Sequence, residues 1–182
     1  ATLSIDDLDL RGQRVLCRVD FNVPLDSADG ATTVTDDTRI RAALPTIRKI
    51  IADGGKAILM SHLGRPKGEP DPALSLRPVA DYLDDLLDGP VHFCEDTVGD
   101  RARTMVHNLP EGGVLLLENT RFNPGEKAND DAFARQLAEL ADVYVNDAFG
   151  TAHRAHASTE GVAHHVPQAA MGYLVAKEIE VL

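Results

Sequence analysis

Residues 58–66 read ILMSHLGRP, and the character of this stretch changes in its middle. The first three residues are apolar, as in a strand buried on both faces, whereas a histidine and an arginine follow within five positions. The sequence carries a net charge of −11, so cations at the tip of a buried strand run against the background charge. We therefore interpret residues 61–65 as a loop that faces a small anion.

Four other short apolar runs are similar to the start of this stretch. All five are rich in β-branched or aliphatic residues and lack polar alternation, which is typical of strands covered on both faces. Cys17 and Cys94 fall inside such runs, and we interpret them as small buried residues rather than a disulfide or metal pair. The five predicted strands are Val15–Val19, Ala57–Met60, Val91–Cys94, Val114–Leu117 and Val143–Val145.

Helical periodicity separates these predicted strands. The apolar spacing in residues 79–87 predicts a helix, with Ser75 as its N-cap. A second helix is predicted over residues 133–140, where the acidic residues 130–131 favour the helix start.

A further helical segment covers residues 39–53 and ends at Gly54, and Pro45 predicts a break after its first turn. Alternating strands and helices imply right-handed crossovers, so we predict a three-layer αβα Rossmann-like domain with a parallel sheet and helices on both faces. This domain is expected to span residues 1–170. Residues 171–182 resemble the first turns of another helix, which suggests that the sequence is part of a longer protein.

Composition narrows the class of protein. The net charge argues against contact with nucleic acid or anionic lipid, whose phosphates would be repelled. No apolar run approaches the roughly 20 residues that span a bilayer, and no signal peptide opens the sequence, so we expect a cytoplasmic protein. Arginine outnumbers lysine 13 to 5 and aspartate outnumbers glutamate 20 to 9, which fits either a salt-adapted protein or an ordinary acidic enzyme.

The strongest functional signal lies where the predicted strands end. Ligands of an open parallel sheet bind beyond the carboxyl ends of its strands. Taken singly, each polar residue there has an ordinary structural explanation, but four arginines at one edge are hard to ascribe to chance. The residues concerned are Asp20, Asn22, His62, Arg65, Arg121, His153 and Arg154, together with Arg39 at the start of the first helical segment.

The chemistry of this set suits a compact polyanion. Guanidinium groups bind carboxylate and phosphate oxygens in bidentate fashion. Asp20 would repel a phosphate, so it is expected to accept a hydrogen bond from a substrate hydroxyl, with Asn22 beside it. Neither G-x-G-x-x-G after the first strand nor G-x-x-x-x-G-K-[ST] occurs in the sequence. These residues predict a site that binds a phosphorylated acid and that has no nucleotide-binding motif of its own.

Five stretches resemble motifs of the phosphoglycerate kinase family, in that family's order. The first, third and fifth are long and distinctive. The resemblance covers the family's N-terminal domain, which is about half the length of a protein of this family. The stretches are RVDFNVP (18–24), TRIRAALPTI (38–47), LMSHLGRP (59–66), LENTRF (117–122) and VNDAFGTAHRAHAS (145–158).

The resemblance implies phosphoryl transfer between ADP/ATP and 3-phosphoglycerate, with 1,3-bisphosphoglycerate as the phosphorylated partner and with magnesium, in glycolysis. It implies that Arg39 is catalytic and stabilises the transferring group. The implied substrate contacts are Asp20, Phe21, Asn22, Arg39, His62, Leu63, Gly64, Arg65, Arg121, His153 and Arg154.

The family's nucleotide-binding domain is absent from the sequence. The resemblance therefore implies that Mg-ATP or Mg-ADP binds to that missing domain, and that residues 171–182 begin the interdomain helix leading to it. This chain is then expected to bind 3-phosphoglycerate without turnover and without a cofactor of its own, and the intact protein is expected to be a monomer.

Three alternatives stay open at this point. The first is a non-catalytic domain that binds phosphorylated acids. The second is half of a Rossmann-type dehydrogenase, which the missing glycine fingerprint disfavours. The third is a metal site at His153 and His156 or at His164 and His165, which no carboxylate or thiolate cluster accompanies in the sequence.

Overall fold

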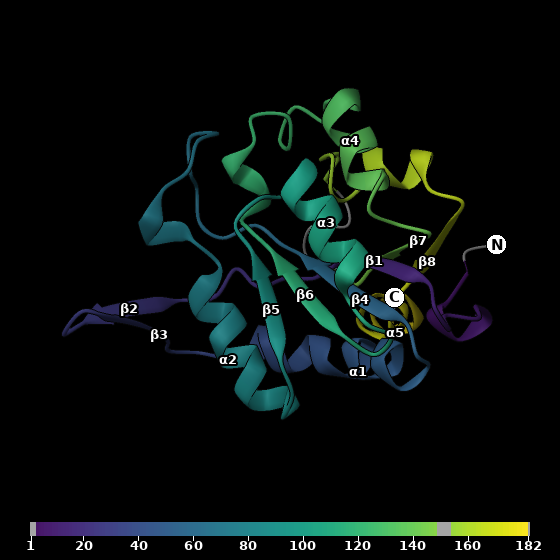
Figure 1. The fold of residues 1–182 in the computed structure, drawn as a ribbon, viewed down its shortest axis with the longest axis horizontal. Helices are drawn as coiled ribbons and strands as arrows, with labels where there is room; N and C mark the ends of the chain where they lie inside the picture. The colour runs from purple at the N-terminus through teal and green to yellow at the C-terminus, as the bar shows by residue number, and fades with distance from the viewer. Residues whose placement is uncertain (1–2, 149–153, 182) are drawn as a thin grey trace.

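The computed structural model describes residues 3–148 and 154–181, and a six-stranded parallel sheet forms its centre (Figure 1). The strands lie in the order β5-β6-β4-β1-β7-β8. All five predicted strands are confirmed to within one residue at each end. The six strands are β1 (Arg14–Arg18), β4 (Lys56–Met60), β5 (Val91–Cys94), β6 (Val114–Leu117), β7 (Val143–Asn146) and β8 (Gln168–Met171).

The sheet is covered on both faces, because neighbouring strand residues belong to two separate cores. Val15 and Cys17 of β1 pack in one core, with the apolar side chains of α1 (Thr38–Ala52) and α2 (Arg77–Leu87). Leu16, between them, packs in the other core, with α3 (Asp100–Asn108) and α4 (Asp131–Ala138). The predicted three-layer αβα arrangement is thus confirmed.

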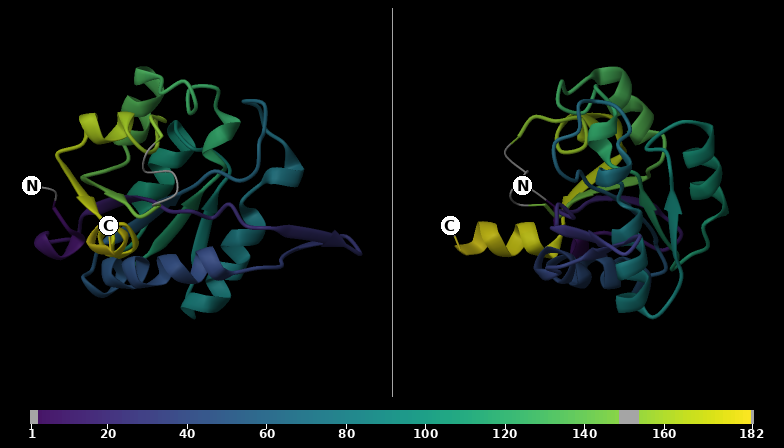
Figure 2. Two further views of the ribbon diagram at one scale, coloured as in Figure 1. Left: turned by 180° about the vertical axis from the view of Figure 1, so that it is seen from behind. Right: turned by 90° about the vertical axis from the view of Figure 1, so that its left-hand side faces the viewer.

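The remaining elements are short or peripheral. The helix α5 (Tyr173–Val181) contacts α1 and projects from the body of the molecule (Figure 2). No helix within the described ranges is long and apolar enough to cross a membrane. Both cysteines are buried and free, as predicted. The short 3-10 helices are η1 (Ile5–Asp7), η2 (Pro72–Leu74), η3 (Thr120–Phe122) and η5 (Gly161–His165).

Two details of the predicted helices are wrong. Pro45 does not break α1, which runs through it without interruption. Residues on both sides of Pro45, such as Leu44 and Ile47, are buried, and their packing outweighs the single hydrogen bond that proline cannot donate. The N-cap of α2 is Leu76 rather than Ser75, although the Ser75 hydroxyl still accepts the N–H of Arg77 at 3.2 Å.

A β-hairpin that the apolar pattern did not predict projects from one end of the molecule (Figure 1). Its strands β2 (Leu25–Ala28) and β3 (Ala31–Val34) are antiparallel and mostly exposed. Asp29 and Gly30 join them, both with positive φ, as the two-residue turn of a hairpin requires. This Asp-Gly pair is the signal that would have identified the hairpin from the sequence.

The order of the strands explains where a ligand can bind. β1 lies between β4 and β7. After β4 the chain crosses to the edge strand β5, returns to β6 between β5 and β4, and then crosses to β7 on the other side of β1. In an open α/β sheet such a reversal leaves a crevice beyond the carboxyl ends of the strands concerned. The segments that follow β1, β4, β6 and β7 therefore meet at one edge of the sheet.

Candidate functional site

A continuous set of hydrogen bonds joins the loops at three strand ends. Asn22, in the loop after β1, accepts the N–H of Gly64 through its side-chain oxygen at 2.9 Å. Arg39 Nη1 donates to the carbonyl of Asn22 at 2.6 Å, and Arg121 Nη1 donates to the carbonyl of Gly64 at 3.2 Å. Asp20 accepts the N–H of Asn22 at 3.1 Å and lies 3.6 Å from Arg39 Nη1. The fold thus brings together residues that are about a hundred positions apart in the sequence.

A single buried amide, Asn119, connects the loop after β4 to the loop after β6. Its Oδ1 accepts the backbone N–H groups of Leu63 and Arg121, at 3.2 and 3.0 Å. Its Nδ2 donates to the carbonyls of Leu63 and Leu74, at 2.7 and 3.0 Å. The position of Arg121 is therefore fixed relative to the loop that contains Gly64, and the two loops behave as one unit.

Arg18 is the main residue of this edge that the sequence analysis missed. It is the last residue of β1 and is fully buried. Its Nη2 lies 2.8 Å from His62 Nδ1, and its Nε donates to Ser158 Oγ at 2.9 Å. Ser158 in turn donates to the buried carboxylate of Glu126 at 2.5 Å. An arginine ending an apolar strand is the signal that could have revealed this network.

The same contact fixes the state of His62. A guanidinium can only donate hydrogen bonds, so His62 Nδ1 must accept and the ring proton resides on Nε2. Burial, together with the positive charges of Arg18, Arg121 and Arg154, lowers the pKa of His62 to about 2. At neutral pH His62 is therefore an uncharged ring with one N–H to donate.

Several cations of this edge lie close to one another. Burial lowers the pKa of Arg121, and the charges of Arg18 and Arg154 add to that effect. Within the described ranges, Arg65, Arg121 and Arg154 form no ion pair with a carboxylate.

Six of the eight arginines elsewhere in the described ranges pair with acids, whereas the exposed Arg11 and Arg48 do not. Arg14 pairs with Asp142 at 3.0 Å, and Arg41 pairs with Asp37 at 2.6 Å. The two buried arginines of the described ranges, Arg18 and Arg121, both lie at the carboxyl edge of the sheet, where an anionic ligand would add negative charge.

A cavity lies at one side of this edge. Its volume is about 540 Å³, and Asn22 and Arg39 line it together with Asp36 and Thr38. Arg39 has about half of its side chain exposed, so it can reorient toward a ligand. Asp36 accepts both the N–H and the hydroxyl of Thr38, and these hydrogen bonds lower its pKa. This carboxylate remains ionised and marks an acidic rim beside the cationic edge.

Some residues of the predicted set cannot act through their side chains in this arrangement. Phe21 and Leu63 are buried in the core, so only their backbone faces the loops. Phe21 N–H donates to the hydroxyl of Ser61 at 2.9 Å. His153 lies outside the described residues.

The described part of the chain holds no group of three metal-ligating side chains. His164 and His165, which the sequence left open as a metal pair, contact separate carboxylates. His164 lies 2.7 Å from Glu160, and His165 lies 2.6 Å from Asp131. His156 instead lies among the cations, and burial lowers its pKa.

Comparison with known proteins agrees with the geometry. A family model described as phosphoglycerate kinase matches residues 5–182. The phosphoglycerate kinase of Salinibacter ruber is 65% identical over 99% of this chain and 46% of its own length. That of Moorella thermoacetica is 60% identical over 100% of this chain and 45% of its own length. The chain thus spans somewhat less than half the length of these relatives.

Solved structures give the same result. The structure of phosphoglycerate kinase from Coxiella burnetii superposes with a TM-score of 0.87 at 40% identity, over 99% of this chain and 44% of that one. The enzyme from Pyrococcus horikoshii OT3 superposes with a TM-score of 0.85 at 36% identity, over 98% and 44%. At such identities the similarity extends beyond the general αβα arrangement.

Proposed function

This chain belongs to the phosphoglycerate kinase family and corresponds to its N-terminal half, and from that premise we propose that it binds 3-phosphoglycerate or 1,3-bisphosphoglycerate. In the intact enzyme a phosphoryl group would pass between this substrate and ADP or ATP. The reaction is a step of glycolysis, so we place the protein in the cytoplasm. The observation that carries the proposal is the group of arginines without carboxylate partners at the edge of the sheet.

The roles follow from what each side chain can donate or accept. Arg65, Arg121 and Arg154 would bind the phosphate of the substrate, because guanidinium groups match its oxygens. The Asp20 carboxylate can only accept hydrogen bonds, so it would accept one from the 2-hydroxyl of the substrate. His62, held neutral with its proton on Nε2, would donate to the substrate without adding a charge.

The attacking group in this reaction is the carboxylate of 3-phosphoglycerate, which is ionised at neutral pH. No general base is needed, and catalysis must come from alignment and from stabilisation of charge on the moving phosphoryl group. We assign the latter role to Arg39, whose exposed guanidinium is tethered by the carbonyl of Asn22.

Magnesium and the nucleotide are proposed to bind to the half of the enzyme that this chain lacks. Helix α5 would lead toward it, and its start is firmly held. Thr46 Oγ1 accepts the N–H of Tyr173 at 2.9 Å, and Asp147 Oδ1 accepts the N–H of Leu174 at 2.9 Å. Burial raises the pKa of Asp147 to about 6, so this anchor stays mainly ionised at pH 7. We propose residues 1–170 as the substrate domain, and no turnover by this chain alone.

Calorimetric titration of the 182-residue chain tests the binding proposal. 3-Phosphoglycerate is expected to bind with a Kd between micromolar and low millimolar, and more weakly at high salt, because exposed charges are screened. D-Glycerate, which lacks the phosphate, is the matched control and should bind far more weakly. Heat indistinguishable from that of buffer would show that this chain has no formed site.

A further inference from the structure

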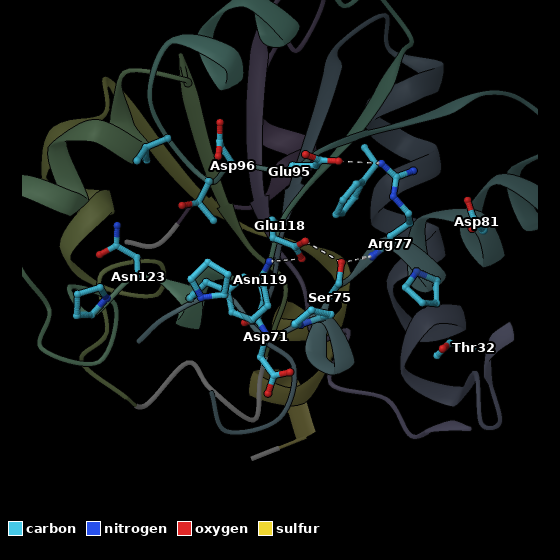
Figure 3. A pocket seen from close by; sticks show the side chains of 18 residues that line it. Thr32, Asp71, Ser75, Arg77, Asp81, Glu95, Asp96, Glu118, Asn119 and Asn123 are labelled. Carbon is cyan, nitrogen blue, oxygen red and sulfur yellow. Dashed lines mark hydrogen bonds and ion pairs between the residues drawn. The ribbon is translucent and has the colours of Figure 1, made fainter. Parts of the chain in front are cut away.

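A second cavity lies beyond the carboxyl ends of β5 and β6, and its volume is about 780 Å³ (Figure 3). Its walls come from η2, from the start of α2 and from the segments that follow β5 and β6, so it is separate from the cavity beside Arg39. The size falls within the range of small-molecule sites.

The apolar part of the lining is rigid. Apart from Val98, it consists of four prolines and two aromatic rings, and the fixed φ of proline limits how far such walls can move. A pocket whose walls are already in place loses little entropy when a ligand binds. The residues are Pro70, Pro72, Pro78, Pro124, Phe93 and Phe122.

The charged part of the lining is acidic. Five carboxylates and one cation, Arg77, line the cavity, so the lining sums to −4. Arg101, outside the lining, pairs with Glu95 at 3.0 Å and with Asp96 at 3.5 Å and offsets part of this charge. Glu118 is buried, and its oxygens accept hydrogen bonds from the Ser75 hydroxyl at 2.7 Å and from the N–H of Leu76 at 2.8 Å. Three of the others, Asp81, Glu95 and Asp96, are exposed. An anion would be repelled here, in contrast to the edge described above.

Arg77 shows what kind of group these walls accommodate. Its guanidinium lies 4.8 Å from the centre of the Phe93 ring, and its Nη2 lies 3.7 Å from Glu95 (Figure 3). A planar cation on an aromatic face beside a carboxylate is a favourable arrangement. More than half of the Arg77 and Glu95 side chains is exposed, so a ligand can compete with this contact.

From this lining we propose that the cavity binds a small organic cation with a flat aromatic body. The ring would pack on the proline and phenylalanine walls, and the cationic group would face Asp81, Glu95 and Asp96. This proposal does not depend on the binding of phosphoglycerate, because none of the arginines assigned to that substrate lines the cavity.

Benzamidine is a suitable probe, and benzamide, which has nearly the same shape without the charge, is its control. Titrations of the chain followed by ¹H–¹⁵N NMR are expected to shift the amide signals of Phe93, Asp96 and Asn123. The affinity for benzamide should be lower by about fivefold or more, because benzamide forms neither the ion pairs nor the cation–π contact. Equal affinity for the two compounds, or shifts confined to other regions, would overturn the proposal.

Two matched substitutions test the polarity of the site. Asp81→Asn should weaken benzamidine binding about two- to fivefold, whereas Asp85→Asn, one turn further along α2 and outside the cavity lining, should not. Arg77→Met should strengthen binding, because it removes the competing internal cation. Loss of benzamidine binding in Arg77→Met would make this arginine an anchor rather than a competitor, and the proposed cation specificity would be wrong.

Discussion

The arginine cluster at the central strands and the cavity beyond β5 carry opposite charge. At the central strands, buried Arg18 and Arg121 lie near Arg154, and the one buried carboxylate beside them, Glu126, is reached by Arg18 through Ser158. Beyond β5, Glu95 and Asp96 follow the strand, and Arg77 and Arg101 only partly offset them. In a chain with net charge −11, an acidic surface is expected without selection for a ligand. A cationic surface on such a chain requires that few acidic residues lie near it, so it is the stronger indication of a ligand site.

The largest expected effect is the loss of kcat on substitution of Arg39, which its neighbours should not show. In the intact enzyme, Arg39→Ala should lower kcat by roughly 10³-fold or more, the range seen for analogous arginines in phosphoryl transfer. The Kd for 3-phosphoglycerate should change far less, because other arginines bind the phosphate.

Arg41→Ala is the matched control for Arg39→Ala. It lies on the same helix but pairs with Asp37, so kcat should be retained. Steady-state kinetics and calorimetry on both variants separate the two parameters. An unchanged kcat in Arg39→Ala would remove this residue from the transfer step.

Arg18 tests whether the cationic edge is also structural. Arg18→Met leaves the carboxylate of Glu126 buried without its nearby cation, and removing one partner of a buried charge network costs about 3–5 kcal/mol. Urea unfolding should show this loss, whereas Arg48→Met on exposed α1 surface should change stability by less than about 0.5 kcal/mol. Adding Glu126→Gln to Arg18→Met should restore part of the stability. A loss below about 1 kcal/mol for Arg18→Met would mean that the network is not cooperative.

The central part of the fold was predictable because its signals are local. Five strands appear as apolar runs without alternation, since helices cover both faces of the sheet. The hairpin at residues 25–34 and helix α3 escaped because they bury few apolar residues. The edge strand β8 escaped because its apolar residues are two alanines and a methionine, with no β-branched residue to indicate a strand. Pro45 was misjudged because tertiary packing, which periodicity does not report, decides whether a helix tolerates it.

The topology of a parallel sheet made most of the candidate site predictable, but the prediction was incomplete because some contacts form only in the folded chain. Parallel strands place their carboxyl ends at one edge, so polar residues such as Asp20 and Arg121 could be grouped from sequence. Arg18 was missed because it lies inside a strand rather than after one. The net charge of the segment after β5 depends on ion pairs such as that of Arg101 with Glu95, and these pairs form only in the folded chain.

A matched pair of arginines compares the two regions directly. Arg121→Lys should weaken 3-phosphoglycerate binding by about tenfold, because lysine cannot form the bidentate contact with a phosphate. Arg77→Lys, in the acidic cavity, should leave that affinity within about twofold, since an exposed charge elsewhere contributes little. Calorimetry at low salt measures both. Because lysine keeps the positive charge, an unchanged affinity in Arg121→Lys as well would show that the chain attracts the anion by its overall field rather than by a bidentate contact at one site.

The smallest effect concerns the neutral member of the cationic edge. The pKa of His62 is about 2 in the folded chain, so NMR of its ring should show the Nε2–H tautomer and no titration between pH 5 and 8. In urea the same ring should titrate near 6.5, its ordinary value.

The sign of the pH dependence follows from this difference. The unfolded state binds a proton below about pH 6.5 and the folded state does not, so the stability linked to His62 is present above pH 6.5 and lost as pH falls toward 2. His62→Gln, which cannot be protonated, should flatten the stability profile between pH 6.5 and 4. Bound 3-phosphoglycerate should raise the pKa of His62, because its negative charge offsets Arg18, Arg121 and Arg154. A ring that titrates above pH 5 without ligand would mean that the arginines do not surround His62 in solution, and the contrast between the arginine cluster and the acidic cavity would then be lost.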